Sequence, residues 1–178
     1  MAILITCPIC GGDFKDSRSY TATSGVAFAP PHPLYEFCDA GLHLGCLVDW
    51  PHRLEYSKGY FDGERQFAVT SGTLLIERED WILRCGPAPK EKDPYYAEVD
   101  LIDWPFRLYS RFERWDAFVA GAFRERLDGP ALARAEEVMQ EVMTLAPTMS
   151  NLRALRTQTV TGKAPNQAPQ TTPLTRRV

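Results

Sequence analysis

The chain has no long apolar run. Hydrophobic residues make up 44% of its 178 residues, yet no segment approaches the roughly 20 consecutive apolar residues of a membrane-spanning helix. Residues 1–6 lack the basic start of a secretory signal and are too short for one, so they favour a strand. We therefore expect a cytoplasmic protein with one domain, or two tightly joined subdomains, around its own core.

Basic residues are scarce over most of the chain. Residues 1–150 hold 15 Lys and Arg against 23 Asp and Glu, a net charge of −8, whereas residues 151–178 hold five Lys and Arg and no acid. A nucleic-acid footprint normally needs a basic face, so the acidic body argues against nucleic acid as the partner. Residues 157–178 have almost no apolar side chains and predict a disordered basic tail.

Cysteines are few and unevenly placed. Four of the five lie within the first 46 residues, and none follows until Cys85. This distribution suits a reducing compartment and a metal site better than a disulfide framework. Cys85 itself, at the end of an expected strand, is predicted to be a small core residue rather than a nucleophile.

Two matched pairs of potential ligands stand close together in the sequence. The first is Cys7-Pro8-Ile9-Cys10-Gly11-Gly12, and the second is His43-Leu44-Gly45-Cys46. The glycines let backbone amides face the sulfurs, and the spacing of His43 and Cys46 puts both on one face of a helical turn. Thiolate and imidazole are the ligands that zinc prefers, four to a closed structural site. The sequence thus predicts one structural Zn²⁺, with metal ligands Cys7, Cys10, His43 and Cys46.

Other residues are possible ligands, and one alternative stays open. Cys38 could replace His43, because a loop can deliver a single thiolate, although that abandons the matched spacing. His32 and His52 also lie near in sequence.

The same scarcity of ligands excludes several zinc-dependent activities. A RING-type ubiquitin ligase needs eight ligands for two sites, and the sequence provides ligands for one. A His-Asn-His nuclease needs a positioning asparagine, but Asn151 and Asn166 both lie near the expected disordered end. Catalytic zinc keeps a position open for water, whereas four protein ligands close the site. We therefore expect no enzyme.

The knuckle resembles that of treble-clef zinc fingers, in which a Cys-Pro-x-Cys-Gly turn is closed by ligands at the start of a helix. Residues 37–51 also resemble small bacterial proteins with an Asp-x-x-x-His-x-x-Cys-x-x-x-Trp helix, some of which look like immunity or accessory proteins. The resemblance covers about the first third of the chain. It implies a treble-clef finger and a role in binding a protein.

Periodicity predicts an α+β fold beyond the finger. We expect a zinc finger over residues 1–56, an α+β body over residues 57–156 and the tail over residues 157–178. The expected elements of the body are a strand at 66–70, hairpins at 73–77 with 81–85 and at 96–102 with 106–112, helices at 113–127 and 130–145, and a short turn at 151–156.

Two groups of side chains in the body invite functional interpretations. Glu98 and Asp100 share one face of a strand, and we expect an exposed polar face there rather than an acid–base pair. Aromatic residues and arginines also gather after residue 94, and we expect most of these aromatics to fill the core. They are Tyr95, Tyr96, Trp104, Phe106, Tyr109 and Phe112, with Arg107, Arg111 and Arg114.

These features predict a non-enzymatic zinc protein that binds another protein. In the immunity-like form, the acidic body would block a basic toxin, because opposite charges speed association. The alternative is a zinc-finger regulator or nucleic-acid-associated protein that uses the basic tail. An enzyme would instead need a pocket that joins Cys85, His52 or the carboxylates.

Overall fold

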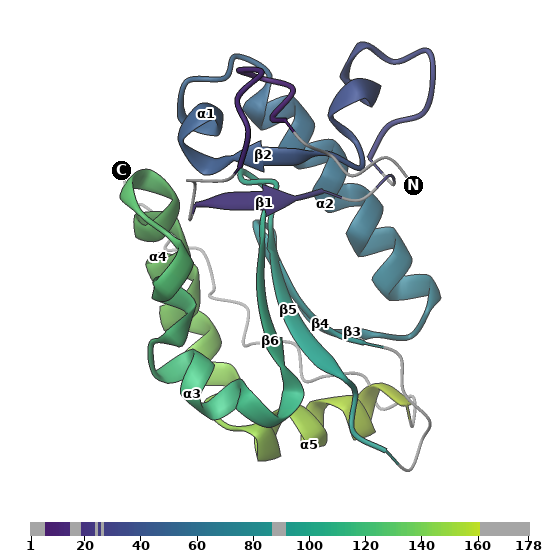
Figure 1. Cartoon of the computed structure of the whole chain (residues 1–178). Helices are drawn as coiled ribbons and strands as arrows, with labels where there is room; N and C mark the ends of the chain where they lie inside the picture. Colours follow the sequence, from purple (N-terminus) through teal and green to yellow (C-terminus); the bar gives the residue numbers. More distant parts are fainter. Residues whose placement is uncertain (1–5, 15–18, 24, 26, 87–91, 161–178) are drawn as a thin grey trace, which may run out of the picture.

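Two antiparallel sheets linked by a long helix organise the chain (Figure 1). The computed structural model describes residues 6–14, 19–23, 25, 27–86 and 92–160. The class is α+β, as the sequence predicts. The elements are β1 (Tyr20–Ala22), η1 (Pro33–Phe37), β2 (Gly41–His43), α1 (Leu44–Val48), α2 (Arg53–Thr70), β3 (Leu74–Glu77), β4 (Trp81–Cys85), β5 (Tyr96–Leu101), β6 (Arg107–Arg111), η2 (Phe112–Arg114), α3 (Trp115–Ala120), η3 (Ala122–Arg126), α4 (Gly129–Leu145) and α5 (Met149–Val160).

The larger sheet has the strand order β3-β4-β5-β6, in which each strand pairs antiparallel with the next. Both predicted hairpins are confirmed: β3 with β4, and β5 with β6. Arg84 of β4 lies opposite Glu98 of β5, and Asp100 of β5 lies opposite Arg107 of β6. Because neighbours across strands point to the same face, this register brings charged side chains of three strands together on one face.

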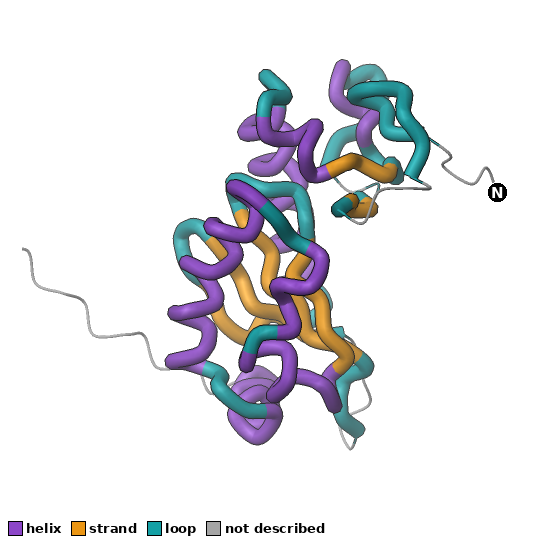
Figure 2. Tube along the Cα trace, turned by 60° about the vertical axis from the view of Figure 1, so that its left-hand side comes forward, coloured by secondary structure: helices purple, strands orange, loops and turns teal. Residues whose placement is uncertain are grey.

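The opposite face of this sheet holds the main core. Figures 1 and 2 show α3 and α4 on one side of the strands, and Figure 1 shows α2 on the other side. Alternate residues of β4 and β5 pack against these helices. Trp115 of α3 ties α3 to the end of α4, because its indole N–H donates to the Ala146 carbonyl at 2.8 Å. The buried residues on this side include Trp81, Leu83, Cys85, Ala97, Val99, Leu101, Val138, Met139 and Leu152.

The strand predicted at residues 66–70 is wrong, because these residues form the last turns of α2. Phe67, Val69 and Thr70 favour strands locally, but Phe67 and Val69 point outward and Ala68 is fully buried. Helical spacing of the residues that face the sheet outweighs local preference. The buried residues of α2 are Tyr56, Ser57, Tyr60, Phe61, Glu64 and Ala68.

The C-terminal helices follow the prediction with two corrections. The helix expected at residues 113–127 is broken at Gly121, whose φ of 145° lies in a region that glycine adopts readily. The helix expected at 130–145 is α4. The turn expected at 151–156 belongs to α5, which continues to Val160, so the prediction of disorder is wrong for residues 157–160. Residues 161–178 lie outside the described part of the chain.

A buried ionic cluster fills the space between α2 and the sheet. The guanidinium of Arg84 pairs with Asp100 at 2.6 Å, with Glu64 of α2 at 2.8 Å, and with Glu98. Arg84, Glu64, Glu98 and Asp100 are each at most 4% exposed. The expectation of an exposed polar strand face is therefore wrong: Glu98 and Asp100 do share a face, but α2 covers it.

Arg107 of β6 borders this cluster and is less buried. Its Nε donates to the Tyr60 hydroxyl at 2.7 Å, while Glu98 and Glu64 lie 3.7 Å and 3.9 Å from its terminal nitrogens. Three carboxylates thus face two guanidinium groups. Burial raises the pKa of Glu98 to about 7 and also raises the pKa of Asp100, although Arg84 opposes both shifts. The cluster therefore retains a proton as the pH approaches neutrality.

This cluster makes stability depend on pH. The pKa of Glu98 is about 7 in the folded chain against an ordinary 4.5, so the native state binds more protons between these values. The contribution of Glu98 is fully present below pH 4.5 and is lost as the pH rises to about 7, a change on the order of 3 kcal/mol. Urea unfolding at several pH values should show a flatter profile for Glu98→Gln than for the wild type. An exposed control, Glu113→Gln, should keep the wild-type slope, and parallel profiles for all three proteins would contradict the assignment.

Candidate metal centre

The first ligand pair sits in a tight backbone knuckle. The Cys7 amide donates to the Gly12 carbonyl at 2.8 Å, and the Gly11 amide donates to the Cys7 carbonyl at 2.7 Å. Gly11 has a φ of 72°, which a residue with a Cβ adopts only with strain. The Gly12 amide then points at Cys10 Sγ, 3.4 Å away. The chain folds back as the sequence predicts, and an amide faces a sulfur.

The second ligand pair lies where β2 meets α1. His43 ends β2, opposite Tyr20 of β1, and Cys46 falls in the short helix that follows. Leu44 and Leu47 are buried and anchor this helix in the core. The helical turn therefore places His43 and Cys46 on one side, toward the knuckle.

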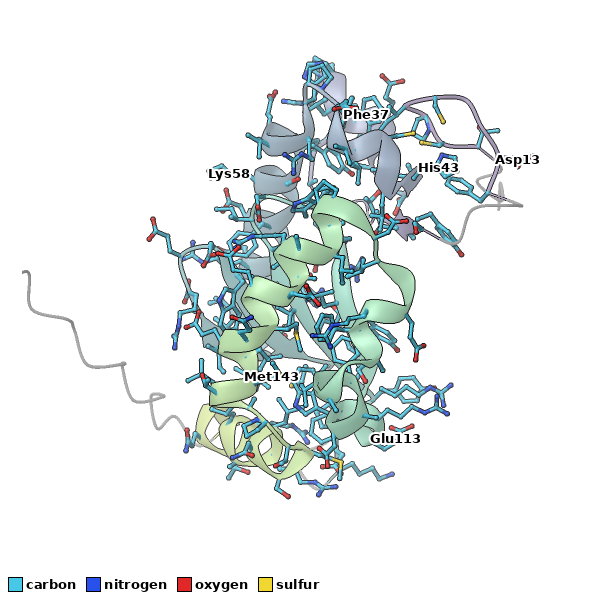
Figure 3. All side chains as sticks on the ribbon, turned by 90° about the vertical axis from the view of Figure 1, so that its left-hand side faces the viewer. Asp13, Phe37, His43, Lys58, Glu113 and Met143 are labelled. Carbon is cyan, nitrogen blue, oxygen red and sulfur yellow. The ribbon has the colours of Figure 1, made fainter. Side chains whose placement is uncertain are left out.

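The two pairs converge on one point. The ligand atoms of Cys7, Cys10, His43 and Cys46 all lie within 4.8 Å of one another. His43 Nδ1 is 3.4 Å from Cys10 Sγ and 3.8 Å from Cys46 Sγ, and Figure 3 shows sulfur atoms gathered beside His43. Tetrahedral zinc, with bonds of about 2.3 Å to sulfur and about 2.0 Å to nitrogen, requires sulfur–nitrogen separations of about 3.5 Å. These four residues could hold a metal ion with little movement.

The imidazole of His43 is oriented by its second nitrogen. Nε2 lies 3.0 Å from the Asp13 carbonyl oxygen, which can only accept, so Nε2 carries the proton. Nδ1 then presents its lone pair to the sulfurs. The ring of Phe14 also packs against the imidazole, with centroids 4.6 Å apart. Metal-binding histidines are commonly held by such an outer hydrogen bond, which fixes the tautomer.

The thiols of the cluster differ in acidity. The Gly12 amide, followed by His43, lowers the pKa of Cys10 to about 7, whereas burial raises the pKa of Cys46 to about 12. Coordination requires thiolates, so a bound cation would displace protons from the cluster. Four protein ligands complete a tetrahedral shell, which is the arrangement of a structural ion.

Cys38 lies apart from this cluster. Its Sγ is 3.9 Å from the carbonyl oxygens of Phe28 and Leu34 and 4.0 Å from the Tyr56 hydroxyl. Among the described residues, His43 and not Cys38 lies with Cys7, Cys10 and Cys46. Cys85 is 3% exposed within the main core, and burial raises its pKa to about 11. Its place matches the expected core role, because a buried thiol of this kind is a poor nucleophile.

The remaining histidines have local structural contacts. His32 Nδ1 accepts the Leu34 amide at 3.1 Å and so caps η1, while its ring stacks on Phe28. His52 is exposed before α2, with Glu55 3.8 Å away. Two carboxylates at the turn between β3 and β4 also have partners, since Glu77 pairs with Arg65 and Asp80 pairs with Arg134.

The aromatic cluster divides between core and surface. Trp104, Phe106 and Phe112 are buried, whereas Tyr96 is only partly buried, so half of the six aromatics fill the core rather than the expected majority. Tyr95 is 64% exposed and Tyr109 is 47% exposed. The sequence-based prediction did not separate the buried aromatics from the exposed ones. The alternation of residues 107–111 could have indicated the difference, because Leu108 points into the core and Tyr109 points away from it.

Comparisons of the chain with protein-family models, curated proteins and solved structures find no match in any of the three. Among the described residues, no helix is both long and apolar enough to span a membrane. The local chemistry of the chain must therefore carry any functional proposal.

Metal content tests the ligand assignment directly. The purified wild-type protein should hold about one zinc ion per chain, as a closed four-ligand site does. Cys46→Ser should lose most of this zinc, because serine is a poor zinc ligand at neutral pH. Cys38→Ser is the matched control and should retain it, since Cys38 lies outside the cluster. Elemental analysis that finds full zinc in Cys46→Ser, or none in Cys38→Ser, would overturn the assignment.

Proposed function

We propose that this chain is a zinc protein whose ion stabilises the fold and which acts by binding another protein rather than by catalysis. The convergence of four protein ligand atoms within 4.8 Å carries the proposal. Such a set fills the tetrahedral shell of zinc and leaves the ion no role as an activator of water. The zinc contributes folding free energy, because an unfolded chain does not hold its four ligands together.

The contacts around the ligand cluster indicate which segments of the chain a bound ion would link. On one side, η1 is tied to α2 by the Tyr56 hydroxyl, which donates to the Phe37 carbonyl at 2.7 Å. The knuckle, by contrast, is largely exposed at Pro8, Cys10 and Gly11. We infer that zinc fastens the knuckle to β2 and α1, and that side-chain packing fastens η1 to α2. Since α2 runs across the predicted boundary at residue 56, it connects the finger to the sheet.

Protein binding is supported by exposed side chains at one edge of the larger sheet. Tyr95, Tyr109 and Arg111 are exposed there, and the Arg111 guanidinium lies 5.7 Å from the centre of the Tyr95 ring. Tyrosine and arginine are enriched at the centres of protein interfaces, where they contribute large contact areas and directional hydrogen bonds.

The resemblance to treble-clef fingers and to immunity-like bacterial proteins adds a finer proposal. The acidic body, with a net charge of −8 over residues 1–150, would attract a basic partner such as a toxin. The regulator that uses a basic tail has less support. Of the five Lys and Arg residues at positions 151–178, Arg153 already pairs with Asp93 at 2.5 Å, and Arg156 donates to the Lys92 carbonyl.

Chelation separates a structural ion from a catalytic one. Strong chelation should expose the finger, with proteolysis first between residues 6 and 48 and with the sheet and α4 more resistant. Circular dichroism should show a partial loss of structure that zinc restores. The matched control is a chelator already saturated with zinc, which should change nothing. An intact fold that loses a hydrolytic activity on chelation would contradict the proposal.

Affinity purification tests the binding role. The zinc-loaded wild type should retain a specific protein from the cells that produce it, and Tyr95→Ser with Arg111→Ser should lose most of that partner. A double variant on an exposed surface elsewhere, Lys58→Ser with Asp62→Ser on α2, should keep the partner, because it removes only one exposed ion pair. Equal loss in both double variants would contradict a role for the tyrosine–arginine surface.

A further inference from the structure

The strand β6 forms one edge of the larger sheet. It pairs with β5 on one side, and no other strand of the described chain pairs with it on the other side. The opposite edge differs, because α5 lies against β3 and Thr159 Oγ1 donates to the Leu74 carbonyl at 3.3 Å. An uncovered edge presents a row of backbone donors and acceptors that another extended chain can pair with.

The hydrogen-bond pattern identifies the outward groups of β6. The Phe112 amide donates to the Tyr95 carbonyl at 3.2 Å, which makes these two residues a hydrogen-bonded pair in the β5–β6 ladder. Such pairs recur at every second residue, so Leu108 and Ser110 direct their backbone groups toward β5. Arg107, Tyr109 and Arg111 direct theirs toward the free edge.

The side chains of the same three residues project on one face of the sheet. Tyr109 packs beside Tyr96, with ring centroids 5.4 Å apart, and Arg111 lies over Tyr95. Tyr109 is 47% exposed, and the side chain of Arg107 is 28% exposed. A strand added at this edge would therefore lie beside a tyrosine flanked by two arginines, of which Arg111 is exposed and Arg107 also borders the ionic cluster.

Resting on the protein-binding function proposed above, we infer that β6 is the docking strand and that it pairs with an extended segment of another protein. That segment carries acidic residues two positions to either side of an uncharged one, which matches Arg107-Leu108-Tyr109-Ser110-Arg111. Backbone pairing supplies the affinity, and contacts of alternate side chains supply the selectivity. In the part of the chain that the structure describes, Arg111 pairs with Glu113 at 3.9 Å, and both side chains are exposed, so a partner carboxylate can displace this weak pair.

A second copy of this chain fits the edge poorly. The segment from Arg107 to Arg111 reads the same in both directions at its charged and aromatic positions. Antiparallel pairing of two copies about Tyr109 would set Arg107 of each copy opposite Arg111 of the other. Like charges directly opposite one another destabilise a strand pair, so the arginines oppose self-association and favour an acidic partner.

Amide hydrogen exchange tests the geometry of the edge. In the zinc-loaded protein, the amides of Arg107, Tyr109 and Arg111 should exchange much faster than those of Leu108 and Ser110. A short synthetic peptide of threonine and valine, with glutamates two positions to either side of a central tyrosine, should slow the exchange of the three outward amides. The same peptide with lysines in place of glutamates should bind about tenfold more weakly or not at all.

Variants test separately how the backbone and the side chains of β6 contribute to peptide binding. Tyr109→Pro removes an outward donor and leaves the ladder to β5 intact, and it should abolish peptide binding; Tyr109→Thr keeps the amide and should retain most of it. Arg111→Glu should reverse the preference between the two peptides, whereas Arg124→Glu, outside the sheet, should not. Circular dichroism and zinc content verify that each variant is folded.

Several results would overturn the inference. Equal binding of both peptides, or full binding by Tyr109→Pro, would exclude recognition by the β6 edge. A concentration-dependent dimer that protects the outward amides would show that the edge serves self-association instead. If Tyr109→Pro captures the cellular partner as well as the wild type does, the docking strand is wrong while the binding function stands. If the wild type captures no partner, the binding function itself fails.

Discussion

The arrangement of the chain depends on the ion pairs that the buried guanidinium of Arg84 makes. Arg84 is 2% exposed and pairs with carboxylates from α2 and from β5. Removing the Arg84 guanidinium from this buried set would leave its carboxylates without a compensating charge, which is strongly destabilising. The cluster therefore restricts how α2 lies on the sheet more tightly than apolar contacts alone would. Beside it, the apolar part of this layer is small, with Phe61, Ala68 and Ile82 fully packed.

The position of α2 in turn places the finger. The same helix that carries Glu64 to the ionic cluster carries Tyr56 to the Phe37 carbonyl, less than three turns away. Packing thus sets Leu34 and Phe37 of η1 in the core with Cys38 against it, while the ligand cluster gathers the exposed knuckle, β2 and α1. Under the proposed function, metal coordination at the ligand cluster and apolar packing at η1 would stabilise the two sides of this small region separately.

The two edges of the larger sheet are treated differently. At β3, a helix lies along the edge and a threonine hydroxyl bonds a strand carbonyl. At β6, charged and aromatic side chains flank backbone groups that face outward. Arginines on an edge strand hinder pairing between like chains, and the same charges select an acidic partner. Protection from aggregation and recognition of a partner can therefore share one set of residues.

The sequence by itself determined the parts that depend on short-range chemistry. The spacing of Cys7 with Cys10 and of His43 with Cys46 predicted four residues that the structure brings together, because each pair needs only a local turn. The short polar loop between residues 73–77 and 81–85, and the alternation of residues 96–102 and 106–112, predicted both hairpins for the same reason. Tertiary structure alone decided what covers each face. Residues 66–70 have the composition of a strand but extend α2, and Glu98 and Asp100 have the pattern of a solvated face but are buried. In both cases the deciding contact, between α2 and the sheet, joins residues that lie more than 15 positions apart, as Glu64 and Arg84 do. No local preference of the backbone encodes such a contact.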